Sequence, residues 1–261
     1  MRVSRPRGCR CRRRRNIPRY CLVISIDGSK GAAMRPWQVI ESVKTRDGVL
    51  ELRRRGERDF LMVIAGRVLM SSVHHRSEDR LADLSCAALA RKSRPRVLLG
   101  GLGMGYTLRA ALVGLPAHAE ITVVELNAKV VEWNRGPLGH LAGFPMRDER
   151  VTVVVDNVAR VIARARPGRY DAIVLDLYEG PRSATRRTRD PLYGDQAVQA
   201  AASALAPGGI FAVWSEDADI PFEALLETHG FAVKRHKSGQ GGRVHIVYLA
   251  QAGDSAGMRR R

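Results

Sequence analysis

Apolar residues recur in two different patterns along the chain, and the change falls near residue 96. Before it, short runs rich in Val, Ile and Leu are separated by turn residues such as Asp47-Gly48, Gly56 and Gly66, a pattern typical of β-hairpins. The runs cover residues 38–43, 49–54, 59–64 and 67–70. We therefore predict a small antiparallel sheet that forms an N-terminal β segment over about residues 35–75.

A helical spacing of apolar residues follows this segment. Leu81, Leu84 and Leu89 lie behind Ser77, a residue type that often caps helix N-termini, and Pro95 marks the boundary beyond them. We predict a linker helix over residues 77–90 with Ser77 as its N-cap.

From residue 96 onward, apolar strands alternate with helical segments. Such alternation implies right-handed crossovers and a parallel sheet that helices cover on both faces. Strands are predicted at 97–100, 121–125, 151–155, 172–175 and 210–214, helices at 106–113, 128–134, 159–165, 195–205 and 222–229, and a final hairpin at 231–234 and 244–249. The expected fold class is α/β, with a doubly wound, Rossmann-like sheet over about residues 77–250 behind the small β segment.

The net charge of +18 on 261 residues first suggests a nucleic-acid partner. Half of it lies on residues 1–33, where nine arginines and Lys30 face only Asp27, and three more arginines end the chain. Such blocks usually stay solvated, so a disordered tail, or an extension upstream of a start at Met34, explains residues 1–33 better than a phosphate-binding arm does. We expect disordered basic tails at 1–33 and 251–261, with at most non-specific contacts to nucleic acid.

The remaining sequence indicates a soluble protein that holds no metal. No run approaches the roughly 18 apolar residues of a membrane span, and the arginines at 12–15 are not followed by a signal-peptide core. His74 and His75 are neighbours without a third ligand nearby. We expect a cytoplasmic location and no membrane partner.

A glycine-rich turn follows the first strand of the predicted parallel sheet. In such sheets the ligand binds beyond the carboxyl ends of the strands, where the strand order reverses. Gly101, Gly103 and Gly105 are spaced G-x-G-x-G, whereas the dinucleotide fingerprint G-x-G-x-x-G would need a glycine at Tyr106. The turn therefore favours a bound nucleoside but argues against NAD.

Acidic residues follow the next two strands. Glu125 ends the second strand, where a carboxylate can accept hydrogen bonds from both ribose hydroxyls. Asp156 and Asn157, both candidate cofactor-binding residues, follow the third strand. Asp156 could accept a hydrogen bond from an adenine amino group, although an N-cap role for the following helix explains it almost as well, and both could hold.

The fourth strand delivers Asp176 to the same edge, with Tyr178 and Glu179 next along the chain. Two carboxylates three residues apart on a loop over a cofactor suit the binding and deprotonation of an amine. Asp176 is the candidate catalytic base, and Tyr178 and Glu179 are candidate substrate-binding residues.

At this point the chain resembles the spermidine synthases and their relatives among the proteins with the S-adenosylmethionine-dependent methyltransferase fold. The resemblance runs from about residue 48 to 250. It rests on G-L-G-M-G-Y-T-L-R at 101–109, V-V-E-L at 123–126, V-V-V-D at 153–156, Y-D-A-I-V-L-D at 170–176, D-P-L-Y at 190–193 and L-A-P-G-G at 205–209.

The resemblance implies a polyamine aminopropyltransferase-like enzyme that binds decarboxylated S-adenosylmethionine or S-adenosylmethionine. By this resemblance Glu125 would hold the ribose, Asp156 the adenine, and Asp176 would activate the attacking amine. A small amine would be the acceptor, and the hypothesis allows a homodimer.

Departures from the family pattern leave the reaction open. Met104 stands where the family's glycine loop carries an Asp that holds the amino group of the aminopropyl arm. The loop after the fourth strand keeps acids at both acidic positions but changes the residues between them, and residues 74–78 offer no counterpart to the family's Tyr and Gln. Aminopropyl transfer is the leading hypothesis, with methyl transfer from S-adenosylmethionine and a non-catalytic nucleoside-binding protein as alternatives.

Overall fold

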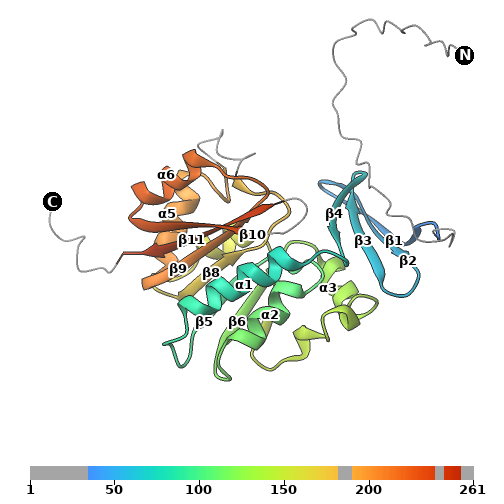
Figure 1. Cartoon of the computed structure of the whole chain (residues 1–261), viewed down its shortest axis with the longest axis horizontal. Coiled ribbons are helices and arrows are strands. Elements are labelled where there is room, and N and C mark those ends of the chain that lie inside the picture. Colours follow the sequence, from blue (N-terminus) through green and yellow to red (C-terminus); the bar gives the residue numbers. More distant parts are fainter. Residues whose placement is uncertain (1–34, 182–189, 239–243, 254–261) are drawn as a thin grey trace, which may run out of the picture. The chain divides into compact units, whose positions relative to one another are not determined.

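A computed structural model of the chain describes residues 35–181, 190–238 and 244–253. The predicted tail at 1–33, residues 254–261 of the tail predicted at 251–261, and most of the turn at 238–242 lie outside these residues. The tail prediction was wrong for residues 251 and 252, which belong to the last strand of the large sheet. Four antiparallel strands come first, in the order in which they follow in the sequence. They are β1 (Gln38–Thr45), β2 (Gly48–Arg55), β3 (Asp59–Ile64) and β4 (Arg67–Ser71), so that β4 forms one edge of this small sheet (Figure 1).

A seven-stranded sheet forms the larger part of the described chain. Its order is β10-β11-β9-β8-β5-β6-β7, with only β11 antiparallel to its neighbours. The strands are β5 (Arg96–Gly100), β6 (Glu120–Glu125), β7 (Val151–Val155), β8 (Tyr170–Leu175), β9 (Leu205–Ser215), β10 (Phe231–Ser238) and β11 (His245–Ala252). The chain passes from β7 to β8 across β5 and β6, so the order reverses between β5 and β8, which is where such sheets bind ligands.

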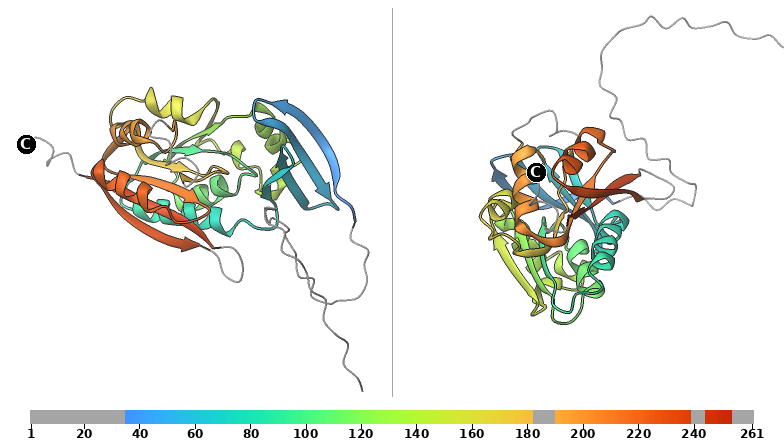
Figure 2. Two further views of the ribbon diagram at one scale, coloured as in Figure 1. Left: turned by 90° about the horizontal axis from the view of Figure 1, so that it is seen from above. Right: turned by 90° about the vertical axis from the view of Figure 1, so that its left-hand side faces the viewer.

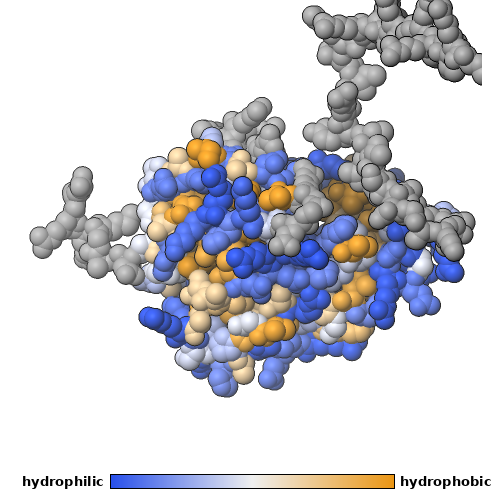
Figure 3. Space-filling model, viewed as in Figure 1, coloured by the Kyte–Doolittle hydropathy of each residue, from blue (hydrophilic) through white to orange (hydrophobic). Residues whose placement is uncertain are grey.

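Helices cover both faces of this sheet, as Figures 1 and 2 show. One apolar core lies under α1 (Arg76–Ala88), α2 (Tyr106–Gly114) and α3 (Ala128–Arg135) and continues into the small sheet. The other lies under α4 (Val158–Ala163), α5 (Asp195–Ala204) and α6 (Ile220–Thr228). On the face that carries α1 and α2, hydrophilic and apolar side chains are interspersed (Figure 3). The predicted fold class, a doubly wound α/β sheet with a small β segment, is confirmed.

Each range predicted as helix or strand overlaps an element of the same type, and the differences lie at the ends. The first helix begins at Arg76, so Ser77 is not its N-cap; His75 holds that position without a capping side chain, and the Ser77 hydroxyl donates to Glu78 instead. β9 starts five residues earlier than predicted because Leu205 already pairs with Tyr170. Among the described residues, no helix is long and apolar enough to cross a membrane.

Candidate functional site at the carboxyl ends of the strands

Three hydrogen bonds between neighbouring strand ends bring the predicted site residues to one edge of the sheet. Gly101 N donates to Val124 O at 2.9 Å, Asp176 N to Gly100 O at 2.9 Å and Asp156 N to Glu125 O at 3.1 Å. The residues that leave β5, β6, β7 and β8 therefore start from adjacent points. The glycine loop and the acidic residues lie together where the strand order reverses, which is the position at which doubly wound sheets form their ligand crevice.

The glycine turn depends on backbone conformations that other residues rarely adopt. Gly101 and Gly105 have φ angles of +92° and +82°, in the left-handed region. A Cβ on Gly101 would lie 2.3 Å from the carbonyl oxygen of Asp176. The turn thus packs directly against the start of the loop that carries Asp176, and α2 begins right after Gly105.

Glu125 is almost fully buried and fixes the glycine turn to the end of β6. Its Oε2 accepts from Leu102 N at 2.9 Å and its Oε1 from Asn127 N at 2.9 Å. Burial raises the pKa of Glu125, and these backbone donors act in the opposite direction. The N–H groups of Leu126 and Gly103 also act on this carboxylate, so a ribose hydroxyl would share oxygens that already accept from the main chain.

Asp156 and Asn157 divide the two roles that the sequence left open. Asn157, not Asp156, caps α4, because its Oδ1 accepts from Ala159 N at 2.8 Å. Asp156 Oδ1 accepts from the Arg160 guanidinium, which lowers the pKa of Asp156. The adenine role stays a prediction for Asp156, and cofactor binding stays a prediction for Asn157, which also caps α4.

Asp176 follows the fully buried strand β8 and faces the N-terminal turn of α2. Its Oδ2 accepts a short hydrogen bond from Thr107 Oγ1. Burial and repulsion by the Glu78 carboxylate raise the pKa of Asp176 to about 7, against the effect of the Thr107 hydrogen bond. A carboxylate with a pKa near neutrality is suited to accept a proton from an amine.

The two acidic residues of the motif at 170–176 have different surroundings. Asp171, at the start of β8, accepts from Lys92 Nζ at 2.7 Å and from Arg96 N at 2.9 Å. It lies at the amino end of the strand, away from the crevice. Asp171 is thus structural, and only Asp176 has the position of a base.

The loop beyond Asp176 is held by residues from distant parts of the chain. Tyr178 and Glu179 are exposed, and the Glu179 carboxylate pairs with Arg67 of β4 at 2.6 Å. The hydroxyl of Tyr193 donates to the Glu179 carbonyl oxygen at 2.9 Å. Tyr193 belongs to the D-P-L-Y motif, whose Asp190 accepts from Leu192 N and Tyr193 N.

The edge strand of the small sheet runs past this crevice. Met70 Sδ lies 3.3 Å from Met104 N, and a Cβ on Gly103 would meet the same sulfur at 2.9 Å. Tyr106 donates from its hydroxyl to Ser72 O at 3.1 Å. The side chain of Met104 points into the core and is fully buried.

Sequence reasoning missed four residues that the structure brings to the site: Thr107, Glu78, Met70 and Arg67. Thr107 could have been found, since it lies within the glycine motif and in the first turn of α2. The other three come from the β segment and the linker helix. Their positions depend on long-range packing that no local pattern encodes.

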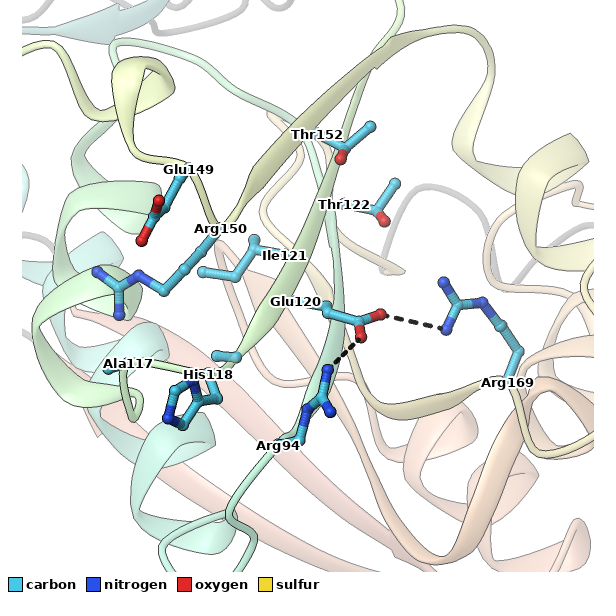
Figure 4. Close-up of a pocket in the computed structure, with 11 residues that line it drawn as sticks. Arg94, Ala117, His118, Glu120, Ile121, Thr122, Glu149, Arg150, Thr152 and Arg169 are labelled. Atoms are coloured by element: carbon cyan, nitrogen blue, oxygen red, sulfur yellow. Dashed lines mark ion pairs between the residues drawn. The ribbon is translucent and has the colours of Figure 1, made fainter.

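A separate hollow of about 380 Å³ lies at the other end of the strands (Figure 4). Arg94 and Arg169 each approach Glu120 to 3.9 Å there, at the amino ends of β5, β6 and β8. Ligands of doubly wound sheets bind at the carboxyl ends, so we do not assign the site to this hollow. Within the described ranges, no three His, Cys, Asp or Glu side chains are arranged to hold a metal.

Comparison with known proteins agrees with this geometry. The chain is 32% identical to putrescine N-methyltransferase 4 of Nicotiana tabacum over 121 residues, which is 46% of this chain. It is also 32% identical to a polyamine aminopropyltransferase of Mycobacterium tuberculosis H37Rv over 128 residues, which is 48% of this chain. These matches span only 30% and 23% of the length of the two relatives.

Solved structures show the same fold. Spermidine synthase from Thermotoga maritima matches with a TM-score of 0.66 at 20% identity, covering 83% of this chain and 74% of that one. A spermidine synthase in complex with the transition-state analogue AdoDATO matches with the same score at 19% identity, covering 83% and 73%.

The family model that matches residues 82–229 is that of the spermine/spermidine synthase domain. This stretch begins in α1, includes the glycine turn and the three acidic strand ends, and closes at the end of α6. It covers more than half of the chain, so the chain belongs to the spermine/spermidine synthase family.

Proposed function

We propose that this protein transfers an aminopropyl group from decarboxylated S-adenosylmethionine to a small amine. The observation that carries the proposal is the position of Asp176, a half-buried carboxylate at the switch point of the sheet, beside the glycine turn, with its pKa raised to about 7. Of the three acidic residues at the ends of β6, β7 and β8, Asp156 is paired with Arg160 and Glu125 accepts main-chain hydrogen bonds, whereas Asp176 accepts from the Thr107 hydroxyl.

The residues of the crevice suit the adenosyl part of such a cofactor. The positive φ angles at Gly101, Gly103 and Gly105 let the main chain approach a ligand closely, Glu125 would hold the ribose, and Asp156 the adenine amino group. When bound, the sulfonium cofactor supplies an electrophilic carbon. These residues fit the nucleoside. Met104, which is fully buried, offers no polar group to the ammonium of the aminopropyl arm.

Asp176 would act on the acceptor. An ammonium has no lone pair, so the acceptor must lose a proton before its nitrogen can form a new bond. The ionised Asp176 accepts that proton, and the protein's main further contribution is to align the free amine. Thr107 fixes the direction of the carboxylate through its hydrogen bond to Oδ2.

Methyl transfer is the second candidate, because Met104 stands where a carboxylate would hold the aminopropyl ammonium and because several relatives are putrescine N-methyltransferases. S-adenosylmethionine has its own carboxylate, which backbone N–H groups can bind. Replacing Met104 by Asp does not separate the candidates cleanly, since the side chain is fully buried and a charge there would destabilise the fold.

The deciding experiment incubates the protein with putrescine and either decarboxylated S-adenosylmethionine or S-adenosylmethionine. Mass spectrometry then distinguishes N-aminopropyl from N-methyl products. We expect the aminopropyl product. Methylated putrescine alone would favour the second candidate, and binding of neither cofactor in calorimetry would contradict both.

Glu125→Gln is expected to weaken the binding of methylthioadenosine by about 1 to 3 kcal/mol, the range for a lost hydrogen bond to a charged group. Because Leu102 N and Asn127 N both donate to this carboxylate, the melting temperature should also fall. Calorimetry and thermal unfolding measure the two effects. The exposed Glu132→Gln serves as control, and an unchanged affinity in Glu125→Gln would contradict the ribose role.

Glu78→Gln tests the electrostatic link to Asp176. Repulsion by Glu78 helps to raise the pKa of Asp176, so removing the charge should lower that pKa. The acid limb of the pH profile of kcat/KM should then shift to lower pH, because Asp176 ionises earlier. Asp83→Asn, on the exposed side of the same helix, should leave the limb in place. A limb that does not move in Glu78→Gln would show that the two carboxyls are not coupled.

A further inference from the structure

Arg67 places a permanent cation at the mouth of the crevice, beside the loop that carries the candidate substrate-binding residues. Its Nη2 lies 2.6 Å from Glu179 Oε1, and its guanidinium lies 5.3 Å from the centre of the Tyr178 ring. The carboxylate of Glu216 also acts on Arg67, and together these neighbours raise its pKa, Glu179 most strongly. Arg67 therefore contacts both substrate-binding candidates at once.

The framework around this pair is fixed from both sides. β4 places Met70 over the glycine turn and, three residues earlier, Arg67 over the loop after β8. On the loop side, Tyr193 holds the carbonyl oxygen of Glu179. The guanidinium is thus delivered to the Glu179 carboxylate by an edge strand whose course along the crevice is set by other contacts.

A diamine acceptor carries one amino group that reacts and a second that stays charged. With Asp176 as the base deep in the crevice, Glu179 is the next carboxylate outward on the same loop, and it already has a cationic partner. A second ammonium would meet Arg67 as a like charge and would find Glu179 occupied.

We infer that Arg67 is a specificity-determining residue that takes the place of an acceptor's second ammonium, so that the enzyme discriminates only weakly between diamines and monoamines. The inference rests on the proposed function, since it concerns the acceptor side of that reaction. The carboxylate of Glu179 then does not favour acceptors with a second ammonium, because Arg67 already pairs with it.

The size of the effect follows from the exposure of the pair. Arg67 and Glu179 are 61% and 48% exposed, so the ion pair itself contributes little to stability. Removing Arg67 affects the binding of a diamine in two ways. The Glu179 carboxylate loses its partner and can pair with the second ammonium, and the positive charge that repels this ammonium is gone. A hydrogen bond to a charged group corresponds to about tenfold or more in affinity, and exposure favours the lower end of that range.

The experiment compares putrescine with 1-aminobutane, which has the same chain and lacks the second ammonium. In the wild type we expect kcat/KM for putrescine to exceed that for 1-aminobutane by less than about threefold. Arg67→Met keeps an apolar side chain over Tyr178 and should raise the ratio by about tenfold, mainly through a lower KM for putrescine. Adding Glu179→Gln to Arg67→Met should return the ratio to its wild-type value.

Arg55→Met is the matched control, because Arg55 of β2 pairs with Asp59 at 3.0 Å within the small sheet. This variant should leave the ratio unchanged. A ratio that Arg67→Met does not move, or a wild type that already prefers putrescine more than tenfold, overturns the inference alone. If the folded wild type turns over neither amine with either cofactor, the proposed function fails and this inference fails with it.

Discussion

Asp176→Asn should bind methylthioadenosine nearly as tightly as the wild type and turn over at least about a hundredfold more slowly. An amide cannot accept the proton that the acceptor ammonium must lose, and a positioned general base typically contributes about 10² to 10⁴ in rate. Asn keeps the size of Asp and can still accept a hydrogen bond from Thr107, so the fold of the loop should survive. Steady-state kinetics and calorimetry on the same preparation measure the two quantities.

The pH dependence gives an independent readout of the same residue. In the wild type, kcat/KM should rise with pH through about 7, where Asp176 ionises, while the residual activity of Asp176→Asn should lose this limb. Glu179→Gln is the matched control: it removes the other carboxyl of the loop but should keep the limb. Wild-type turnover in Asp176→Asn would remove the base and leave transfer by proximity alone, or binding without chemistry.

The same substitution should alter stability in a defined direction. The folded-state pKa of Asp176 is raised from 3.8 to about 7, so its contribution to stability is fully present below about pH 4 and is lost as the pH rises through about 7. Asp176→Asn carries no such charge. The difference in melting temperature between Asp176→Asn and the wild type should therefore increase between pH 5 and pH 8, because only the wild type loses stability as Asp176 ionises.

Local pattern was sufficient for much of this fold. The strands at 97–100, 121–125 and 172–175 are largely apolar, and each ends in or is followed by Gly or an acid, so both the sheet and the edge that carries these residues could be predicted. The parallel order then places Glu125, Asp156 and Asp176 on that edge without any knowledge of contacts. This is why the acidic residues were found.

What sequence could not supply is the part of the site that comes from outside the parallel sheet. Glu78 stands two residues into α1, and its effect on Asp176 exists only because α1 packs beside α2. Arg67 lies 112 residues from Glu179 in the chain. Exposed charged residues on short strands have no periodic signature that singles out one partner, so these contacts appear only in three dimensions.

The role of Asn157 shows a second limit. Sequence placed both Asp156 and Asn157 at the end of the third strand, and either side chain can cap a helix. Which one does so depends on where the first turn of α4 begins, a boundary that pattern fixes only to within a residue or two. The structure gives the cap to Asn157, whereas Oδ1 of Asp156 accepts from Asn157 N and from the Arg160 guanidinium.

Gly101→Ala should be strongly destabilising. At φ +92° an L-residue is strained by about 1 to 2 kcal/mol, and the added Cβ would lie 2.3 Å from the main-chain oxygen of Asp176. A carbonyl of the main chain cannot rotate away as a side chain can, so relief requires the loop to move. Overpacking of this kind costs about 1 to 3 kcal/mol more. We expect unfolding to become easier by about 2 to 5 kcal/mol in total.

Gly230→Ala separates backbone strain from the clash, because Gly230 has a similar φ of +81° and nothing within 4 Å of its added Cβ. It should cost only about 1 to 2 kcal/mol and leave kcat unchanged. In Gly101→Ala, any folded protein should also lose activity, since a shift of about 1 Å in Asp176 can reduce the rate about a hundredfold. Denaturant unfolding measures the loss of stability in each variant, and kinetics at low temperature measure kcat. Equal losses of stability in the two variants, with full activity in Gly101→Ala, would mean that the glycine turn and the Asp176 loop do not touch, and the site would have to be assembled differently.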